Sequence, residues 1–251
     1  MNRRLTPWPR AAAAAGAAAM LGAQALAAPA CTARSGPTMA PVIELYTSEG
    51  CNSCPPADRW LSALKDRADV VGLAFHVDYW DRLGWKDRFA RPGFTQRQSE
   101  QQAVNGARFS YTPQVVLDGH DRKDWPRIAL GAVRPAAPVQ IELTREADAV
   151  VARVTPLGQA PRQLAAYWAV TEFGHRTAVK AGENEGVTLE HDFVVTDYRR
   201  EAAWAAATGA TRSLSFAPGA PSDASRMRKV NLVVVDASTG RPVQALALAC
   251  S

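Results

Sequence analysis

Apolar residues in the first half of the chain form short continuous runs separated by stretches with helical spacing. Runs at 42–46, 70–77 and 115–117 have the length and composition of buried strands. Between the first two runs, apolar residues recur every three or four positions and predict an amphipathic helix: Ala57, Trp60, Leu61 and Leu64. Strands that alternate with helices predict a layered α/β domain.

Turn and capping residues divide this half further. Thr95 and Gln98 match a capping box, and Asn105-Gly106 would end the helix that the box begins. Asp118-Gly119 predicts a tight hairpin after the third strand. Asp124 would cap a last helix, with these side chains facing inward: Ile128, Leu130 and Val133.

The second half changes character after a proline-containing linker at 135–138. Turn residues separate most of its short strand candidates, which lie at 139–143, 150–154, 164–170, 193–195, 214–216, 230–235 and 243–248. Roughly seven short strands in about 110 residues predict an all-β sandwich of the immunoglobulin-like kind.

The N-terminus has the layout of a secretory signal peptide. Arg3, Arg4 and Arg10 accompany an alanine-rich apolar run at 11–26, and Ala25-Leu26-Ala27 fits a cleavage site. We therefore expect a periplasmic or secreted protein with no transmembrane span in its mature chain. The predicted organisation has four segments: a signal peptide (1–27), a leader of the mature chain (28–40), an α/β domain (41–135) and a β-sandwich (136–251).

Charge and composition narrow the possible partners. The formal charge of +5 falls to +2 without the three arginines of the signal peptide, and no basic stripe follows. This pattern argues against nucleic-acid binding, and a hydrophobic content of 47% argues against disorder. The sequence predicts no cofactor.

Export changes the interpretation of the four cysteines, because thiols outside the cytosol tend to form disulfides. The simplest pairing joins Cys51 to Cys54 and, as a structural bond between the chain ends, Cys31 to Cys250. The other two connectivities stay open, and lipidation of Cys31 is a rival to the second bond.

Cys51-Asn52-Ser53-Cys54 is the clearest candidate for chemistry. Cysteines three positions apart at a helix start lie close enough to bridge, and the helix N-terminus favours a thiolate. Cys51 is the expected attacking thiol, and Cys54 would resolve the mixed disulfide. Two alternatives stay open: a permanent structural disulfide, and a metal site made by Cys51, Cys54 and His76, for which copper(I) suits the soft thiolates.

Tyr111-Thr112-Pro113 stands directly before the third strand, where proline is unusual. A cis Thr112–Pro113 bond would explain it and would place the backbone of Thr112 beside the cysteines for substrate docking. An ordinary trans proline at a strand start is the alternative.

Three further polar residues are candidates for moving protons. His76 and Asp78 share one face at the end of the second strand and could serve Cys54, or could have purely structural roles. Glu44 lies inside the first strand, where burial would raise its pKa and make it a proton reservoir, or where it would pair with an arginine.

Other aromatic and histidine residues carry weaker signals. An aromatic-rich segment either lines a groove or belongs to the core, and its members are Tyr79, Trp80, Trp85, Phe89 and Phe94. Three histidines show no ligand spacing and are expected at the surface or in turns: His120, His175 and His191.

Together these motifs resemble a known family. The segment from Val42 to Asp58 is similar to the signature of a secreted bacterial thioredoxin-like family, DUF1223. Further similar segments are 75–81, 84–87, 111–115, 182–184 and 191–192. The resemblance covers nearly the whole mature chain and implies a thioredoxin-like first domain without naming a substrate. Two differences from thioredoxins stand out: Asn52-Ser53 replaces Gly-Pro, and Glu44 lies seven rather than six positions before Cys51.

The leading functional hypothesis is a thiol–disulfide oxidoreductase that acts on protein or small-molecule thiols and disulfides. A metal-binding protein or metallochaperone is the second hypothesis, and a non-catalytic interaction module of the cell envelope is the third. Fold alone does not choose among them, because function depends on the site.

Overall fold

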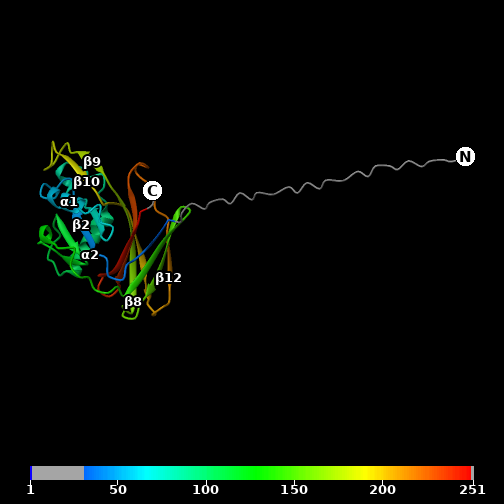
Figure 1. Ribbon diagram of the computed structural model, residues 1–251. Helices are drawn as coiled ribbons and strands as arrows, with labels where there is room; N and C mark the ends of the chain where they lie inside the picture. The colour runs from blue at the N-terminus through cyan, green and yellow to red at the C-terminus, as the bar shows by residue number, and fades with distance from the viewer. Residues whose placement is uncertain (2–30, 250–251) are drawn as a thin grey trace.

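The computed structural model describes residue 1 and residues 31–249. Most of its regular structure is β, since the described residues contain fourteen strands and two α-helices. The predicted signal peptide (1–27), apart from its first residue, and Cys250 lie outside the described residues. Figure 1 shows α1, α2, β9 and β10 gathered on one side of the molecule and β12 on the other.

An eight-stranded mixed sheet runs through both halves of the chain, in the order β14-β13-β8-β11-β3-β2-β4-β5. From the first half come β2 (Val42–Thr47), β3 (Val71–His76), β4 (Gln114–Leu117) and β5 (His120–Asp121). From the second half come β8 (Gln163–Glu172), β11 (Val194–Ala205), β13 (Arg228–Asp236) and β14 (Pro242–Leu248). The halves join where β11 lies parallel to β3, at the pair Val194 and Ala74.

The expected fold class, an α/β thioredoxin-like domain followed by a separate immunoglobulin-like sandwich, is therefore wrong. Strands from both halves belong to one sheet, and one buried cluster contains Tyr46 and Phe75 as well as Tyr167 and Val233. Each half was expected to bury its own apolar faces, but here one face of β8 and β13 packs with residues of the first half.

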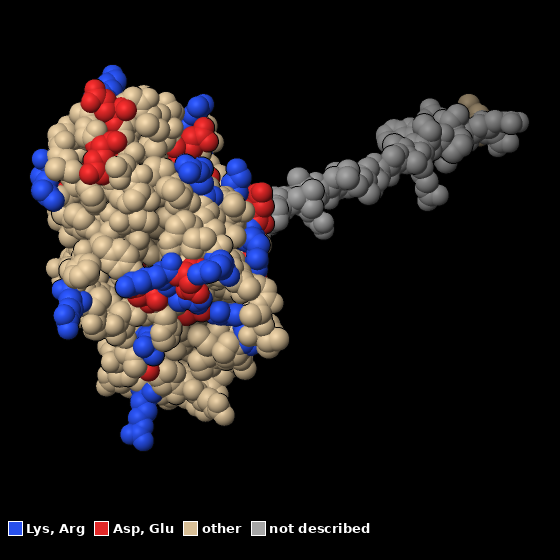
Figure 2. All heavy atoms as spheres, turned by 90° about the vertical axis from the view of Figure 1, so that its left-hand side faces the viewer, with Lys and Arg blue, Asp and Glu red and all other residues tan. Residues whose placement is uncertain are grey.

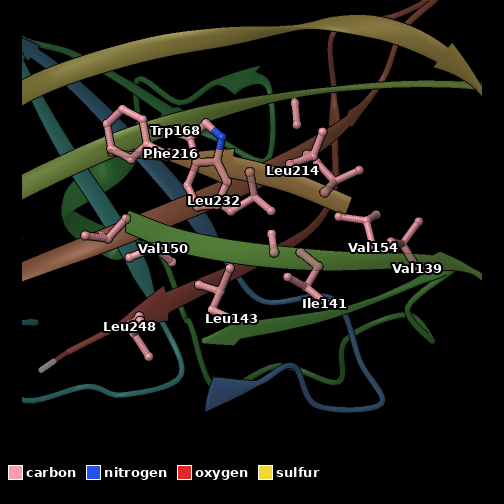
Figure 3. Packing of buried hydrophobic residues seen from close by; sticks show 14 of the residues in the cluster. Val139, Ile141, Leu143, Val150, Val154, Trp168, Leu214, Phe216, Leu232 and Leu248 are labelled. Atoms are coloured by element: carbon pink, nitrogen blue, oxygen red, sulfur yellow. The ribbon is translucent and has the colours of Figure 1, made fainter. Parts of the chain in front are cut away.

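A four-stranded sheet covers the opposite face of β8 and β13. It contains β1 (Thr32–Arg34), β6 (Val139–Glu146), β7 (Ala149–Pro156) and β12 (Arg212–Phe216), in the order β1-β6-β7-β12. The alternation of buried and exposed positions along β6 and β7 points one row of side chains toward the large sheet. Figure 3 shows the resulting core, in which Trp168 stacks on Phe216 with ring centroids 5.4 Å apart.

The two helices pack against the first half of the large sheet. Along β2, Ile43 and Leu45 point into a cluster with α1 (Pro55–Ser62), because alternate side chains of a strand face opposite sides. Val42 and Tyr46 point the other way, into the cluster that contains Phe94 of α2 (Pro92–Val104). Glu44 shares this second face, which decides its partners.

Several local predictions were correct and others were wrong. The Asp118-Gly119 turn exists, with positive φ at both residues, and links β4 to β5. The last helix is wrong, because only a 3-10 turn forms at Trp125–Arg127 and Val133 is fully exposed. The capping box at Thr95 is also wrong, since α2 begins three residues earlier with Arg91 as its N-cap.

Three short elements complete the fold: a 3-10 turn at Asp81–Leu83 and a hairpin of β9 (His175–Ala178) and β10 (Thr188–His191). Neither α-helix of the described chain is long and apolar enough to cross a bilayer. On the face seen in Figure 2, basic and acidic side chains lie in mixed groups.

Candidate functional site

Cys51 and Cys54 form a disulfide between the end of β2 and the start of α1. Their sulfurs are 2.09 Å apart and their Cα atoms 5.5 Å apart. Cys54 is the N-cap of α1, and its carbonyl accepts hydrogen bonds from the N–H groups of Ala57 and Asp58. Pro55 and Pro56 occupy the first two helical positions, where a missing N–H costs no intrahelical hydrogen bond. The sequence therefore opens a helix directly after the disulfide.

Both cysteines are completely buried, and the loop between β9 and β10 contacts the CxxC segment. The side-chain amide of Asn184 donates to the carbonyl oxygens of Glu49 and Cys51, at 2.8 Å and 3.0 Å. The N–H of Asn52 donates to Glu183 Oε2 at 3.1 Å. We call residues 182–184 the cover loop.

Gly182 holds the start of the cover loop against Trp85. It has φ of +80°, and a Cβ there would lie 3.3 Å from the Cβ of Trp85. A side chain at this position would meet both backbone strain and crowding. The cover loop is therefore fixed at two points: at Trp85 by close packing, and at the CxxC segment by hydrogen bonds.

One local prediction about the segment before β4 is confirmed. The Thr112–Pro113 bond is cis, as predicted, at the start of β4. Thr112 Oγ1 accepts a hydrogen bond of 2.8 Å from Trp80 Nε1, and the Cβ of Trp80 lies 3.1 Å from where a Cβ of Gly50 would be. Ser53 Oγ lies 3.4 Å from Cys51 Sγ, within hydrogen-bonding distance of a sulfur atom.

A buried pair of His76 and Asp87 lies at the end of β3. His76 Nδ1 is 2.6 Å from Asp87 Oδ2, and both side chains are fully buried. Asp87 also accepts hydrogen bonds from the backbone N–H groups of Glu49 and Phe89, both at 2.9 Å. Burial alone would raise the pKa of Asp87, but His76 and these N–H groups lower it to about 2. Burial would lower the pKa of His76, but Asp87 raises it above the usual value.

His191 and Glu49 extend this pair toward the disulfide. The rings of His76 and His191 have centroids 5.0 Å apart, and His191 Nε2 lies 3.4 Å from Glu49 Oε1. Glu49 Oε2 accepts a 2.8 Å hydrogen bond from Trp85 Nε1. Within the described ranges, His76 Nε2, Glu49 Oε1 and both ring nitrogens of His191 are buried without a hydrogen-bond partner. Such unsatisfied polar atoms are rare in folded proteins and mark this cluster as chemically unusual.

Asp58 completes the cluster from the side of the helix. It lies one turn after Cys54 on α1 and accepts a 3.0 Å hydrogen bond from Thr47 Oγ1. Burial raises the pKa of Asp58, although the charges of His191 and His76 oppose the shift. We call Glu49, Asp58, His76, Asp87 and His191 the buried acid–histidine cluster.

The other predicted proton carriers lie elsewhere. Glu44 is on the α2 face of β2, where it pairs with Arg97 and accepts hydrogen bonds from Tyr46 at 2.5 Å and Tyr167 at 2.7 Å. This arrangement matches the alternative of an arginine partner. Asp78 Oδ1 accepts a 2.6 Å hydrogen bond from Thr95 Oγ1. Among the predicted residues, only His76 belongs to the buried acid–histidine cluster.

Sequence analysis missed most of this cluster. His175 and His191 were expected at the surface or in turns, but they are only 2% and 3% exposed, whereas His120 is exposed. Asp58 and Asp87 had been noted only as parts of longer motifs. Asp58 follows the CxxC motif closely in the sequence and Asp87 lies within the aromatic-rich segment, and these positions were the one signal that could have marked both as site residues.

The alternative metal site and the predicted disulfide between Cys31 and Cys250 can be compared with the described residues. Over the described residues, no group of three or more His, Cys, Asp or Glu side chains is arranged to hold a metal ion. Cys31 is not a free thiol. Cys250 lies outside the described residues, so its bond to Cys31 stays a prediction.

A family model described as "Protein of unknown function (DUF1223)" matches residues 42–235. The chain belongs to this family. The match begins at the first residue of β2 and ends in β13, so it includes the CxxC motif, the cover loop and the whole buried acid–histidine cluster. No curated protein sequence matches the chain.

Two solved structures have a similar fold. Protein AGR_C_4864 from Agrobacterium tumefaciens is 28% identical, with a TM-score of 0.63, and the match covers 85% of this chain and 96% of that chain. HBP35 of Porphyromonas gingivalis is 15% identical, with a TM-score of 0.57, and the match covers 84% of this chain and 74% of that one. The second similarity concerns the fold alone.

Proposed function

We propose that this protein is an exported thiol–disulfide oxidoreductase that uses Cys51 and Cys54. The observation that carries the proposal is the position of the disulfide, at a helix start and next to the buried acid–histidine cluster. A structural disulfide needs no titratable neighbours, whereas thiol–disulfide exchange needs groups that accept and return protons. The basic N-terminus and the alanine-rich run that follows it support export.

In the reductive direction, the Cys51 thiolate attacks one sulfur of a substrate disulfide. A bond forms between Cys51 and the substrate, and the other substrate sulfur leaves as a thiolate that takes a proton. The hydroxyl of Ser53 and the N-terminus of α1 stabilise the attacking thiolate.

Cys54 closes the cycle. It gives its thiol proton to Asp58, attacks Cys51 Sγ and releases the second substrate sulfur as a thiolate, which is then protonated. Two electrons pass from the cysteine pair to the substrate. Asp58 suits this role because burial raises its pKa toward that of a proton acceptor, and because it lies on the same side of α1 as Cys54.

Cysteine variants test the proposal. We expect Cys51→Ser to abolish the reduction of a model disulfide, because it removes the attacking thiol. We expect Cys54→Ser to accumulate mixed disulfides through Cys51, detected by mass spectrometry of the exported protein. Ser99→Ala, at an exposed position of α2 outside the site, is the control and should keep both reaction steps. Absence of turnover in the native protein would overturn the oxidoreductase, and adducts on Cys51→Ser but not on Cys54→Ser would reverse the roles.

The cover loop predicts how access to the disulfide is limited. Asn184→Ala removes two hydrogen bonds that hold this loop on Glu49 and Cys51, so we expect dithiothreitol to reduce the disulfide roughly tenfold faster. The rate is followed by alkylation of the released thiols.

A matched control comes from a second asparagine. Asn105 also donates two side-chain hydrogen bonds to carbonyl oxygens, those of Gln101 and Gly119. Asn105→Ala should leave the reduction rate unchanged. Equal rates in the native protein and in Asn184→Ala would mean that the cover loop does not limit access.

A further inference from the structure

A cavity lies beside the buried acid–histidine cluster, and Phe89 contacts both. The cavity has a volume of about 600 Å³, within the range of small-molecule sites. The ring of Phe89 lines it and lies 4.7 Å from the ring of His175, 5.2 Å from that of His76 and 5.8 Å from that of His191. His175 lines the cavity, whereas the other two histidines do not.

Arginines dominate the charge of this cavity. Arg88 and Arg91 come from the segment before α2, Arg226 precedes β13, and Arg228 is the first residue of β13. Arg88 and Arg91 donate only to backbone carbonyl oxygens, and neither forms an ion pair with a described residue. Each guanidinium has five donors, so both keep free donors for a ligand.

The acidic residues of the cavity already have partners. Glu172, which is 1% exposed, accepts hydrogen bonds from the N–H and the hydroxyl of Ser222. Asp197 accepts from the N–H of Gly219 at 3.1 Å, and Asp223 accepts from the N–H and the hydroxyl of Ser225. Arg226 and Arg228 also face Asp223 and Glu172, so the excess positive charge of the cavity comes from Arg88 and Arg91, with Asp197 as the remaining acidic residue.

The positive charge of the cavity also affects the buried side chain of His175. Burial and the charges of Arg226 and Arg88 lower the pKa of His175 to about 4, although Glu172 opposes the shift. The side chain is 2% exposed and its Nε2 lies 3.2 Å from Glu172 Oε2, but that atom forms no hydrogen bond with any residue of the described chain. Arg228 Nε is likewise buried without a hydrogen-bond partner in this part of the protein.

We propose that this cavity binds a small molecule that carries carboxylate or phosphate groups. Guanidinium groups pair with such oxyanions through charged hydrogen bonds, often two at a time. Arg88 and Arg91 supply guanidinium groups with no carboxylate partner among the described residues, whereas Arg226 and Arg228 lie 3.7 Å and 4.0 Å from Asp223 and Glu172. His175 Nε2, which forms no hydrogen bond in the described chain, supplies a further polar contact. The proposal does not depend on the redox chemistry of Cys51 and Cys54, since none of its residues belongs to the CxxC segment.

Calorimetric titration of the full mature protein with inorganic phosphate, and separately with succinate, tests the site at constant ionic strength set by chloride. We expect saturable binding of one equivalent of at least one probe. The Arg88→Gln, Arg91→Gln double variant should weaken this binding at least tenfold, because two charged hydrogen-bond donors are lost. Asp223→Asn should tighten it roughly two- to threefold by removing a nearby negative charge.

The control removes two exposed arginines from the four-stranded sheet, through Arg153→Gln and Arg212→Gln. This variant has the same change in net charge and should bind as the native protein does. Binding of phosphate alone would assign a phosphate-bearing ligand, and binding of succinate alone a carboxylate. Absence of saturable binding for both probes, or an equal loss in the control, would overturn the site.

Discussion

Arg97→Met is expected to lower the free energy of unfolding by about 3–5 kcal/mol, the cost of leaving a buried charge without its partner. Arg97 and Glu44 have side chains 7% and 2% exposed. Glu44 also accepts hydrogen bonds from Tyr46 and Tyr167, and Arg97 donates to Tyr198 at 3.1 Å. Methionine replaces the unbranched aliphatic part of the side chain but leaves the carboxylate with only neutral partners. Urea unfolding at neutral pH measures the loss.

Two comparisons separate the buried charge from other effects. Arg200→Met breaks an exposed ion pair with Glu100 and should cost less than about 1 kcal/mol. Adding Glu44→Gln to Arg97→Met should recover much of the loss, because the unpaired charge is then absent. If Arg97→Met costs no more than Arg200→Met, the buried pair contributes no stability.

The ion pair of Glu44 and Arg97 helps to join the two halves of the chain. Glu44 belongs to β2, Arg97 to α2, Tyr167 to β8 and Tyr198 to β11, so the cluster joins elements of both halves of the chain. The pKa values of Tyr46 and Tyr167 are raised well above the usual one by burial and by the charge of Glu44. Both phenols therefore stay protonated and act as hydrogen-bond donors to the carboxylate.

Local patterns predicted the strands well and the fold poorly. The apolar runs at 42–46, 70–77 and 115–117 became β2, β3 and β4. Six of the seven strand candidates of the second half lie within strands, and the seventh, 193–195, overlaps the start of β11. The large sheet nevertheless contains strands of both halves, because β11 lies beside β3. That contact joins Val194 to Ala74, more than 100 residues apart, and no local pattern specifies such a pairing.

Two other errors have local causes. β11 continues to Ala205 through polar and charged residues, beyond the short apolar run that marked its start. The hairpin of β9 and β10 has few apolar residues, so hydrophobic alternation did not predict its strands; among its residues are His175, Arg176, Glu190 and His191. Its loop reaches the CxxC segment, so missing this hairpin also meant missing the cover of the site.

For the site, sequence motifs found the cysteines but not the groups around them. The spacing of Cys51 and Cys54 and the helix that follows were sufficient to predict the disulfide. His76 was predicted as a candidate, but its partner Asp87 was not. Asp87 lies in a loop without regular structure, so no periodic pattern placed it beside His76. Loop residues become predictable only when the path of the chain is known.

Asp87→Asn is expected to change both the size and the pH dependence of stability. In the native protein the lowered pKa of Asp87 stabilises the fold above the usual aspartate range, and this contribution is lost as the pH falls from about 4 to about 2. The raised pKa of His76 stabilises the fold below pH about 6.5, and this contribution is lost as the pH rises through the raised value. Near pH 5 both contributions are present, and we expect the variant to lose about 3 kcal/mol there.

The difference in slope between variant and native protein near neutral pH gives the sharper test of Asp87→Asn. In the native protein the contribution of His76 to stability falls as the pH rises, whereas without Asp87 burial lowers the pKa of His76 and this contribution rises with pH. His175 contributes equally to both proteins, so the slope of the variant should be more positive than that of the native protein. Asp148 is exposed in the turn between β6 and β7, and Asp148→Asn should change stability by less than about 0.5 kcal/mol with an unchanged slope. Urea unfolding from pH 3 to pH 8 measures all three proteins. A variant whose slope between about pH 6 and 8 equals the native slope would show that Asp87 does not hold the proton on His76.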